Sequence, residues 1–158
     1  MLRQAENLVE LLKARGLTCA TAESCTGGGV GSAITAVPGS SAVFLGGVIS
    51  YANAVKHGVL GVAEETLASV GAVSSETAAQ MADGARHIIG ADLAVSLTGI
   101  AGPDGGSAEK PVGLVWFGLA TSDGIRTEKA IFAGNRDEIR HSAILHALGM
   151  LTIAACNT

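Results

Sequence analysis

Apolar positions recur along this chain with two different periods, which together predict alternating helices and strands. A helical period of apolar residues over 5–12, closed by Gly16, predicts the first helix, and the apolar run over 17–22 predicts a buried strand. The same patterns predict helices over about 29–37, 54–57, 64–70, 76–89 and 136–154, and strands over 43–51, 93–97, 112–120 and 126–132. Asn53 and Asn135 stand where two of these helices need a cap.

The order of these elements predicts the fold class. Helices and strands interleave, and the last two strands join as a hairpin across Ser122-Asp123-Gly124. We therefore expect one α/β domain over residues 1–158, with three α/β/α layers and a mixed sheet flanked by helices. The final helix should face the core with its apolar residues, which are Ile139, Ala143, Ala147, Met150, Leu151 and Ala154.

Composition narrows the function classes. Hydrophobic residues make up 48% of the chain, charged residues 15% and aromatic residues 3%, and the formal net charge is -4 with no basic run. Nucleic acid is therefore not an expected partner. No apolar run reaches the roughly 20 residues of a membrane span, so a membrane is not expected either. The three cysteines show no metal-binding spacing, so we expect no metal or other cofactor. Their odd number, with no secretion signal at residues 1–15, favours reduced thiols in the cytoplasm.

The segment 25–63 contains a single formally charged side chain, Lys56. Apolar surroundings lower the pKa of a lysine, and a neutral amine can activate a serine. A lysine at the surface is the ordinary alternative. Ser41, which follows a Pro-Gly turn, is the candidate nucleophile, although its neighbour Ser40 is not distinguishable from it. Tyr51 could relay a proton between the serine and the lysine.

Two further segments could bind an anionic substrate. Ser24-Cys25-Thr26 and the three glycines that follow open a helix, where backbone N–H groups favour phosphate or carboxylate. Cys25 could also be a nucleophile there, but no histidine lies near it in the sequence. The glycine-rich loop that begins at Thr98 follows a strand end, where ligands of α/β sheets bind. Arg136, at the start of the last helix, could reach a phosphate.

These motifs together resemble the C-terminal domain of the competence/damage-inducible protein CinA, which also occurs as a stand-alone enzyme. The runs that carry the resemblance extend over nearly the whole chain: Thr21-Ala22-Glu23-Ser24-Cys25-Thr26-Gly27-Gly28, Pro38-Gly39-Ser40-Ser41, Tyr51-Ala52-Asn53-Ala54-Val55-Lys56, Gly71-Ala72-Val73-Ser74, Thr98-Gly99-Ile100-Ala101-Gly102-Pro103-Asp104-Gly105-Gly106 and Lys110-Pro111-Val112-Gly113-Leu114-Val115.

The resemblance implies a metal-free hydrolase that converts nicotinamide mononucleotide and water to nicotinic acid mononucleotide and ammonia, in the recycling of pyridine nucleotides. It implies that Ser41 is the nucleophile, Lys56 the general base and Tyr51 the assisting hydroxyl. If Ser41 is not the nucleophile, Ser24 or Cys25 takes that role. The expected substrate-binding residues are Ser24, Thr26, Gly27, Ser40, Thr98, Gly99 and Arg136. The family also suggests a homo-oligomer, a dimer or higher.

Two alternatives remain open from the sequence. A non-catalytic domain that binds a pyridine nucleotide, or regulates in response to one, would keep the anion-binding segments and dispense with Ser41 or Lys56, yet both are present. An assembly module would account for the apolar composition through buried interfaces between subunits.

Overall fold

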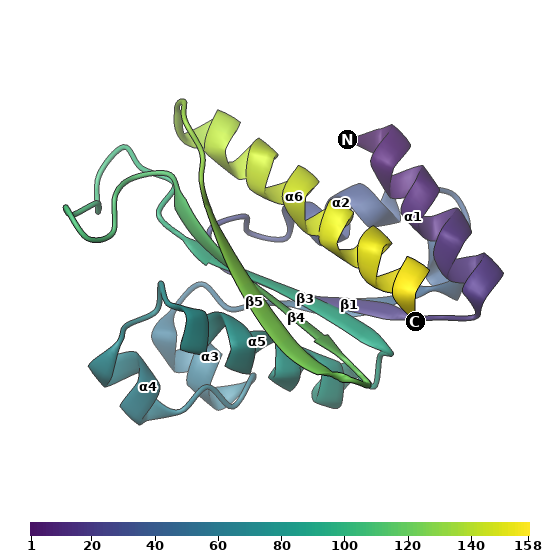
Figure 1. Ribbon diagram of the computed structural model, residues 1–158, viewed down its shortest axis with the longest axis horizontal. Coiled ribbons are helices and arrows are strands. Elements are labelled where there is room, and N and C mark those ends of the chain that lie inside the picture. Colours follow the sequence, from purple (N-terminus) through teal and green to yellow (C-terminus); the bar gives the residue numbers. More distant parts are fainter.

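A mixed five-stranded sheet lies at the centre of the computed structural model, which describes residues 1–158 (Figure 1). In chain order its strands are β1 (Cys19–Glu23), β2 (Phe44–Ile49), β3 (Leu93–Gly99), β4 (Leu114–Thr121) and β5 (Gly124–Ile131). They lie in the order β2-β1-β3-β4-β5. β1 is parallel to both β2 and β3, whereas β3, β4 and β5 are antiparallel neighbours. The sheet is mixed, as predicted.

Helices cover both faces of this sheet. They are α1 (Leu2–Arg15), α2 (Gly29–Thr35), α3 (Asn53–Gly58), α4 (Glu64–Ser69), α5 (Ser75–Ile89) and α6 (Arg136–Asn157), with a 3-10 turn, η1, at Ser40–Ala42. α1, α2 and α6 lie on one face, and α3, α4 and α5 lie on the other (Figure 1). The larger hydrophobic core fills the space under α1, α2 and α6, and a smaller one lies under α5. The three-layer prediction is confirmed.

The last helix shows how local sequence sets an element. Its start is a capping box: the Asn135 side chain accepts the N–H groups of Asp137 and Glu138, and the Glu138 carboxylate accepts the N–H of Asn135. All six residues predicted to face the core are buried. By length and composition α6 could cross a membrane, but half of its apolar window is buried in the protein, as in a core helix.

Two details of the prediction were wrong. Asn53 is the first residue of α3 rather than its cap, which is Ala52, and no side chain caps this short helix. The first strand does not end at residue 22 but includes Glu23, whose side chain is 1% exposed. A charged residue can close a buried strand only when its charge is satisfied inside the protein, and Glu23 finds its partners at the start of α2.

Candidate active site

The parallel pairing of β1 with β2 and β3 gathers the candidate residues. Parallel strands end at the same edge of a sheet, so the segments after β1 and β2 meet there together with the end of β3. A pocket of about 200 Å³ opens at this edge. It is lined by Ser24, Cys25, Tyr51, Lys56, Ala72, Val73, Thr98, Gly99, Ala101 and Arg136. Six of the expected site residues are therefore brought to one place, on elements that are far apart in sequence.

Lys56 is a buried amine that lines this pocket and makes three polar contacts. Its side chain is 1% exposed, and its Nζ lies 3.0 Å from the Ser24 Oγ, 2.7 Å from the Ser50 carbonyl oxygen and 3.2 Å from the Tyr51 carbonyl oxygen. Burial lowers the pKa of Lys56 below its ordinary value, because the charged amine loses water there.

The three oxygen partners of Lys56 can accept from a protonated amine, and they also suit a neutral one. Carbonyl oxygens only accept hydrogen bonds, so the two N–H groups of a neutral amine can donate to Ser50 and Tyr51. The remaining lone pair then faces the hydroxyl of Ser24, which can donate its proton. A contact of this kind would let the amine take the serine proton.

Cys25 lines the same pocket but lacks the environment of a reactive thiol. The residue is 7% exposed, and burial raises the pKa of its thiol to about 11. A thiol with such a pKa stays protonated near neutral pH and is a poor nucleophile. Cys25 is therefore a lining residue, and Ser24 is the hydroxyl in contact with the Lys56 amine.

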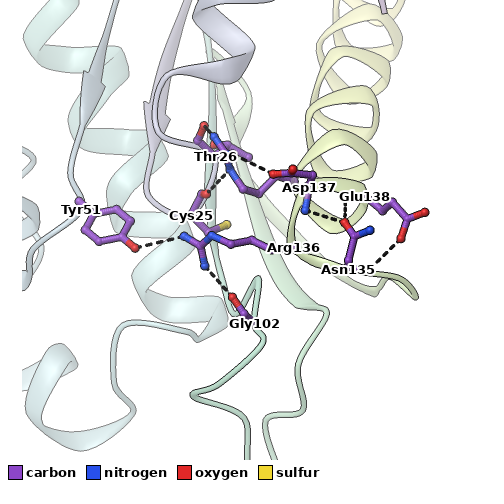
Figure 2. Close-up of polar contacts among 9 residues, drawn as sticks. Cys25, Thr26, Tyr51, Gly102, Asn135, Arg136, Asp137 and Glu138 are labelled. Carbon is purple, nitrogen blue, oxygen red and sulfur yellow. Dashed lines mark hydrogen bonds and ion pairs between the residues drawn. The ribbon is translucent and has the colours of Figure 1, made fainter.

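Arg136 brings a permanent positive charge to the mouth of the pocket. Its guanidinium donates to the Gly102 carbonyl oxygen at 2.8 Å and to the Tyr51 hydroxyl at 3.5 Å, as Figure 2 shows. Arg140, one helical turn further along, donates to the carbonyl oxygens of Cys25 and Thr26. Tyr51 is 65% exposed, and its hydroxyl contacts Arg136, so it does not lie between the serine and the lysine.

The helix N-terminus that was expected to bind an external anion is occupied by the protein's own carboxylate. Glu23 accepts the Thr26 hydroxyl at 2.6 Å and the backbone N–H groups of residues 28, 30 and 31 at 2.9–3.1 Å. Gly27 and Gly28 have φ values of 61° and 94°, which reverse the chain so that these groups face back toward Glu23. Thr26, fully buried, and Gly27 therefore serve this internal contact rather than the pocket.

Glu23 was not among the expected site residues, although the sequence carries a signal for it. A carboxylate at the end of a buried strand, directly before a glycine-rich helix start, is a candidate internal partner for that helix.

Ser40 and Ser41 lie at the other end of β2. They form η1, which precedes the strand, whereas Lys56 follows it. The six residues of β2 span about 20 Å at ~3.3 Å per residue. Ser41 is exposed, and neither serine lines the pocket. Within one chain, the predicted contact of Ser41 with Lys56 is therefore wrong, because an extended strand separates them.

Thr98 and Gly99 line the pocket at the end of β3, as expected. The Thr98 hydroxyl is buried and donates to the Ala72 carbonyl oxygen at 2.7 Å, which ties the loop before α5 to the sheet. A Cβ at Gly99 would lie 2.7 Å from the Leu114 carbonyl oxygen, so this position favours glycine. No group of three or more His, Cys, Asp or Glu side chains is arranged to hold a metal ion.

Comparison with known proteins identifies the family to which this chain is similar. Residues 2–154 match the family described as the CinA C-terminal domain. A relative from Enterobacter agglomerans, named nicotinamide-nucleotide amidohydrolase PncC, is 54% identical over 138 residues, 87% of this chain and 84% of that protein. The protein of the same name from Escherichia coli K12 is 51% identical over 153 residues, 96% of this chain and 92% of that protein.

Longer relatives match as well. A protein of Caldanaerobacter subterraneus is 53% identical over 146 residues, which are 92% of this chain but 35% of that protein, so the chain spans about a third of its length. Among solved structures, the competence/damage inducible protein CihA from Agrobacterium tumefaciens superimposes with a TM-score of 0.94 at 45% identity, covering 98% of this chain and 94% of that one. A CinA superfamily protein from Klebsiella pneumoniae has a TM-score of 0.95 at 33% identity, covering 99% and 98%.

Proposed function

Because the chain belongs to the CinA C-terminal domain family, we propose that it hydrolyses nicotinamide mononucleotide to nicotinic acid mononucleotide and ammonia. Two relatives that it matches over most of their length are named for this activity. The observation that carries the proposal is the 3.0 Å contact between the Lys56 Nζ and the Ser24 Oγ, in a pocket with Arg136 at its mouth. A domain that only binds a nucleotide has no need for a desolvated amine against a hydroxyl.

In the first half of the reaction, Ser24 is the nucleophile and Lys56 the base. The Ser24 Oγ attacks the carboxamide carbon while its proton passes to the neutral Lys56 amine. The N–H of Cys25, next in the chain to Ser24, donates to no backbone carbonyl oxygen and can donate to the oxyanion that forms. Lys56 then returns the proton to the departing nitrogen, the C–N bond breaks, and ammonia leaves an acyl ester on Ser24.

In the second half of the reaction, a water molecule attacks the acyl ester after ammonia has left. Lys56, neutral again, accepts a proton from water as the water oxygen attacks the ester carbon. The ester bond to Ser24 breaks, its oxygen takes the proton back, and the carboxylic acid is released. The same amine serves both halves, so the proposal needs no metal ion and no second base.

The rest of the pocket suits the two ends of the substrate. The carboxamide end lies against Ser24 and the Thr98–Gly99 strand end, while the phosphate lies toward Arg136 at the mouth. The positive charge at the mouth attracts the phosphate without crowding the neutral amine inside. Three unpaired cysteines, one of them exposed, fit the reducing cytoplasm, where we place the enzyme.

Release of ammonia from nicotinamide mononucleotide by the purified protein tests the proposal. Ser24→Ala and Lys56→Met should each lower kcat by at least about a thousandfold, as loss of a nucleophile or its base does. Lys56→Arg should be equally inactive, because a guanidinium stays protonated. Lys129→Met, which removes an exposed lysine on β5, is the matched control and should keep full activity. Near wild-type turnover by Ser24→Ala would refute the assigned nucleophile.

A further inference from the structure

The turn that follows Ser24 is joined to the last helix by one arginine. Arg140 lies one helical turn after Arg136 on α6. Its Nε donates to the Cys25 carbonyl oxygen and its Nη2 to the Thr26 carbonyl oxygen, both at 3.2 Å. Cys25 and Thr26 lie beside the first turn of α6 (Figure 2). The two residues directly after Ser24 are therefore held by both arms of one guanidinium.

The two carbonyl oxygens differ in how far they depend on Arg140. The Thr26 carbonyl oxygen also accepts the N–H of Gly29, at 3.1 Å. No backbone N–H donates to the Cys25 carbonyl oxygen, and Cys25 is 7% exposed. Nearly all backbone carbonyl groups of buried residues in proteins have a donor, because an unpaired one costs free energy. Arg140 supplies to Cys25 the donor that the backbone does not supply.

Glu23 holds the opposite set of groups in the same turn. Its carboxylate accepts the backbone N–H groups of residues 28, 30 and 31, whereas Arg140 donates to the carbonyl oxygens of residues 25 and 26. Hydrogen bonds in which one partner is charged are stronger than neutral ones. The backbone between β1 and α2 is therefore fixed by an anion on its N–H groups and by a cation on its carbonyl groups.

Arg140 is not arranged to bind the substrate phosphate. Each of its three side-chain nitrogens has a partner within the protein, because Nη1 lies 3.7 Å from the Asp137 carboxylate and the other two donate to carbonyl oxygens. Arg140 does not line the pocket, whereas Arg136 does. The two arginines of this helix therefore have different roles.

We propose that Arg140 is a positioning residue for catalysis, which holds the Cys25 and Thr26 carbonyl oxygens and so fixes the turn that presents the Ser24 hydroxyl and the Cys25 N–H to the substrate. Its effect on catalysis rests on the function proposed above, in which Ser24 attacks and the Cys25 N–H donates to the oxyanion. The effect of the contact on the turn does not rest on that function.

Peptide geometry explains how a contact with carbonyl oxygens aims an N–H. The Ser24 carbonyl oxygen accepts the N–H of Gly27 at 3.1 Å. The peptide bond between Ser24 and Cys25 is trans, so its C=O and N–H point in opposite directions and this bond also orients the Cys25 N–H. Arg140 holds the carbonyl on the other side of Cys25. Rotation of the backbone at Cys25 would therefore break one of these two hydrogen bonds.

Arg140→Met removes the guanidinium and keeps an unbranched side chain. Complete loss of an oxyanion donor lowers kcat by about a hundredfold to a thousandfold, and a misplaced group lowers it less. We expect Arg140→Met to lower kcat at least about tenfold and to change KM for the nucleotide less than about threefold, because Arg136 is intact. Arg126→Met, at an exposed arginine of β5 outside the pocket, is the matched control and should keep both values. A raised KM with an unchanged kcat would make Arg140 a phosphate ligand and overturn the inference.

Arg140→Lys separates the shape of the guanidinium from its charge. A lysine keeps the positive charge, but its single nitrogen cannot donate in the two fixed directions of a guanidinium. We expect kcat of Arg140→Lys to stay at least about fivefold below that of the wild type. A wild-type kcat in this variant would show that the charge alone is sufficient, which contradicts a positioning role.

Alkylation of the thiols tests the contact without any activity measurement. Burial raises the pKa of the Cys25 thiol to about 11, and the charge of Arg140 lowers it. Loss of that charge alone would therefore slow alkylation of Cys25, whereas release of the turn would expose the thiol and speed it. At pH 8 we expect Cys25 to react at least about tenfold faster in Arg140→Met than in the wild type. Cys19, fully buried in the larger core, should stay unmodified in both.

The outcomes of these experiments separate the two proposals. Unchanged or slower alkylation of Cys25 in Arg140→Met overturns the contact, and modification of Cys19 as well would mean that Arg140 stabilises the whole fold rather than one turn. If the wild type releases no ammonia but Cys25 becomes reactive in Arg140→Met, the proposed function fails and the contact stands. If the wild type is active and Arg140→Met keeps its kcat, the positioning role fails and the function stands.

Discussion

Glu23→Gln is the substitution that most directly tests how the pocket edge is built. The Glu23 carboxylate accepts four hydrogen bonds, three at Oε2 and one at Oε1. A glutamine of the same shape can keep the three at its oxygen, but its amide nitrogen would then face the N–H of Gly31, donor against donor.

The expected cost follows from these contacts. Hydrogen bonds to a charged acceptor contribute about 1.5–3 kcal/mol and neutral ones about 0.5–1.5, so the three retained bonds weaken by roughly 1 kcal/mol each. The unpaired N–H of Gly31 adds about 1–3 kcal/mol. Relief from burying a charge offsets part of this sum. We expect the free energy of unfolding to fall by about 2–4 kcal/mol, which lowers Tm by about 5–15 °C in a domain of this size.

Urea denaturation monitored by circular dichroism measures this change. Glu76→Gln is the control, because Glu76 is exposed in the first turn of α5 and its loss should change stability by less than about 0.5 kcal/mol. Equal stability of the two variants would refute the reasoning. If the two variants are equally stable, the N–H groups at the start of α2 do not depend on the Glu23 carboxylate and are available to external anions. Phosphate should then stabilise the Glu23→Gln protein more than the wild type.

Burial lowers the pKa of Lys56 from 10.5, so the unfolded chain holds the proton of this amine more tightly than the folded protein does. The free energy of unfolding should therefore fall as the pH drops from about 10.5 to the folded-state pKa, by at most ~1.4 kcal/mol per pH unit. Denaturation at several pH values should show this slope in the wild type and not in Lys56→Met. Activity should rise with pH through the same titration, and a pH profile governed by an acidic group would contradict the assigned base. Burial raises the pKa of Cys19 to about 12 and that of Cys25 to about 11, so mass spectrometry after alkylation of the native protein at pH 8 should find Cys156 alone modified, and Cys25→Ala should stay active. Arg136→Ala should raise KM for the nucleotide about tenfold or more and change kcat little, while equal KM values of the wild type for the nucleotide and its dephosphorylated riboside would count against a phosphate at Arg136.

The sequence predicted the elements well where one local signal dominated. The apolar period and the Asn135 cap located α6, and the turn at residues 122–124 located the hairpin. The uncharged segment around Lys56 allowed either a buried amine or a surface lysine, and the structure shows the buried one. For α6 and the hairpin the deciding interactions lie within a few residues of the chain, where periodicity and capping preferences act.

The identity of the serine beside Lys56 was not a local property. Ser41 is nearer to Lys56 in sequence, but the intervening residues form an extended strand that carries the two apart. Ser24 is more distant in sequence and reaches Lys56 because β1 and β2 lie side by side and run in parallel. Strand order depends on packing of the whole sheet, so no pattern around any single serine could decide between them.

The occupation of the α2 N-terminus by Glu23 has a consequence for how the enzyme responds to its solution. Because Glu23 already neutralises that helix end, the groups that attract a phosphate are the guanidinium groups at the exposed mouth of the pocket. Such attraction is screened by dissolved ions over about 8 Å at physiological ionic strength, whereas the contact between Lys56 and Ser24 is shielded from them by burial. Ionic strength should therefore govern how tightly the nucleotide is captured and leave the rate of the chemical step unchanged.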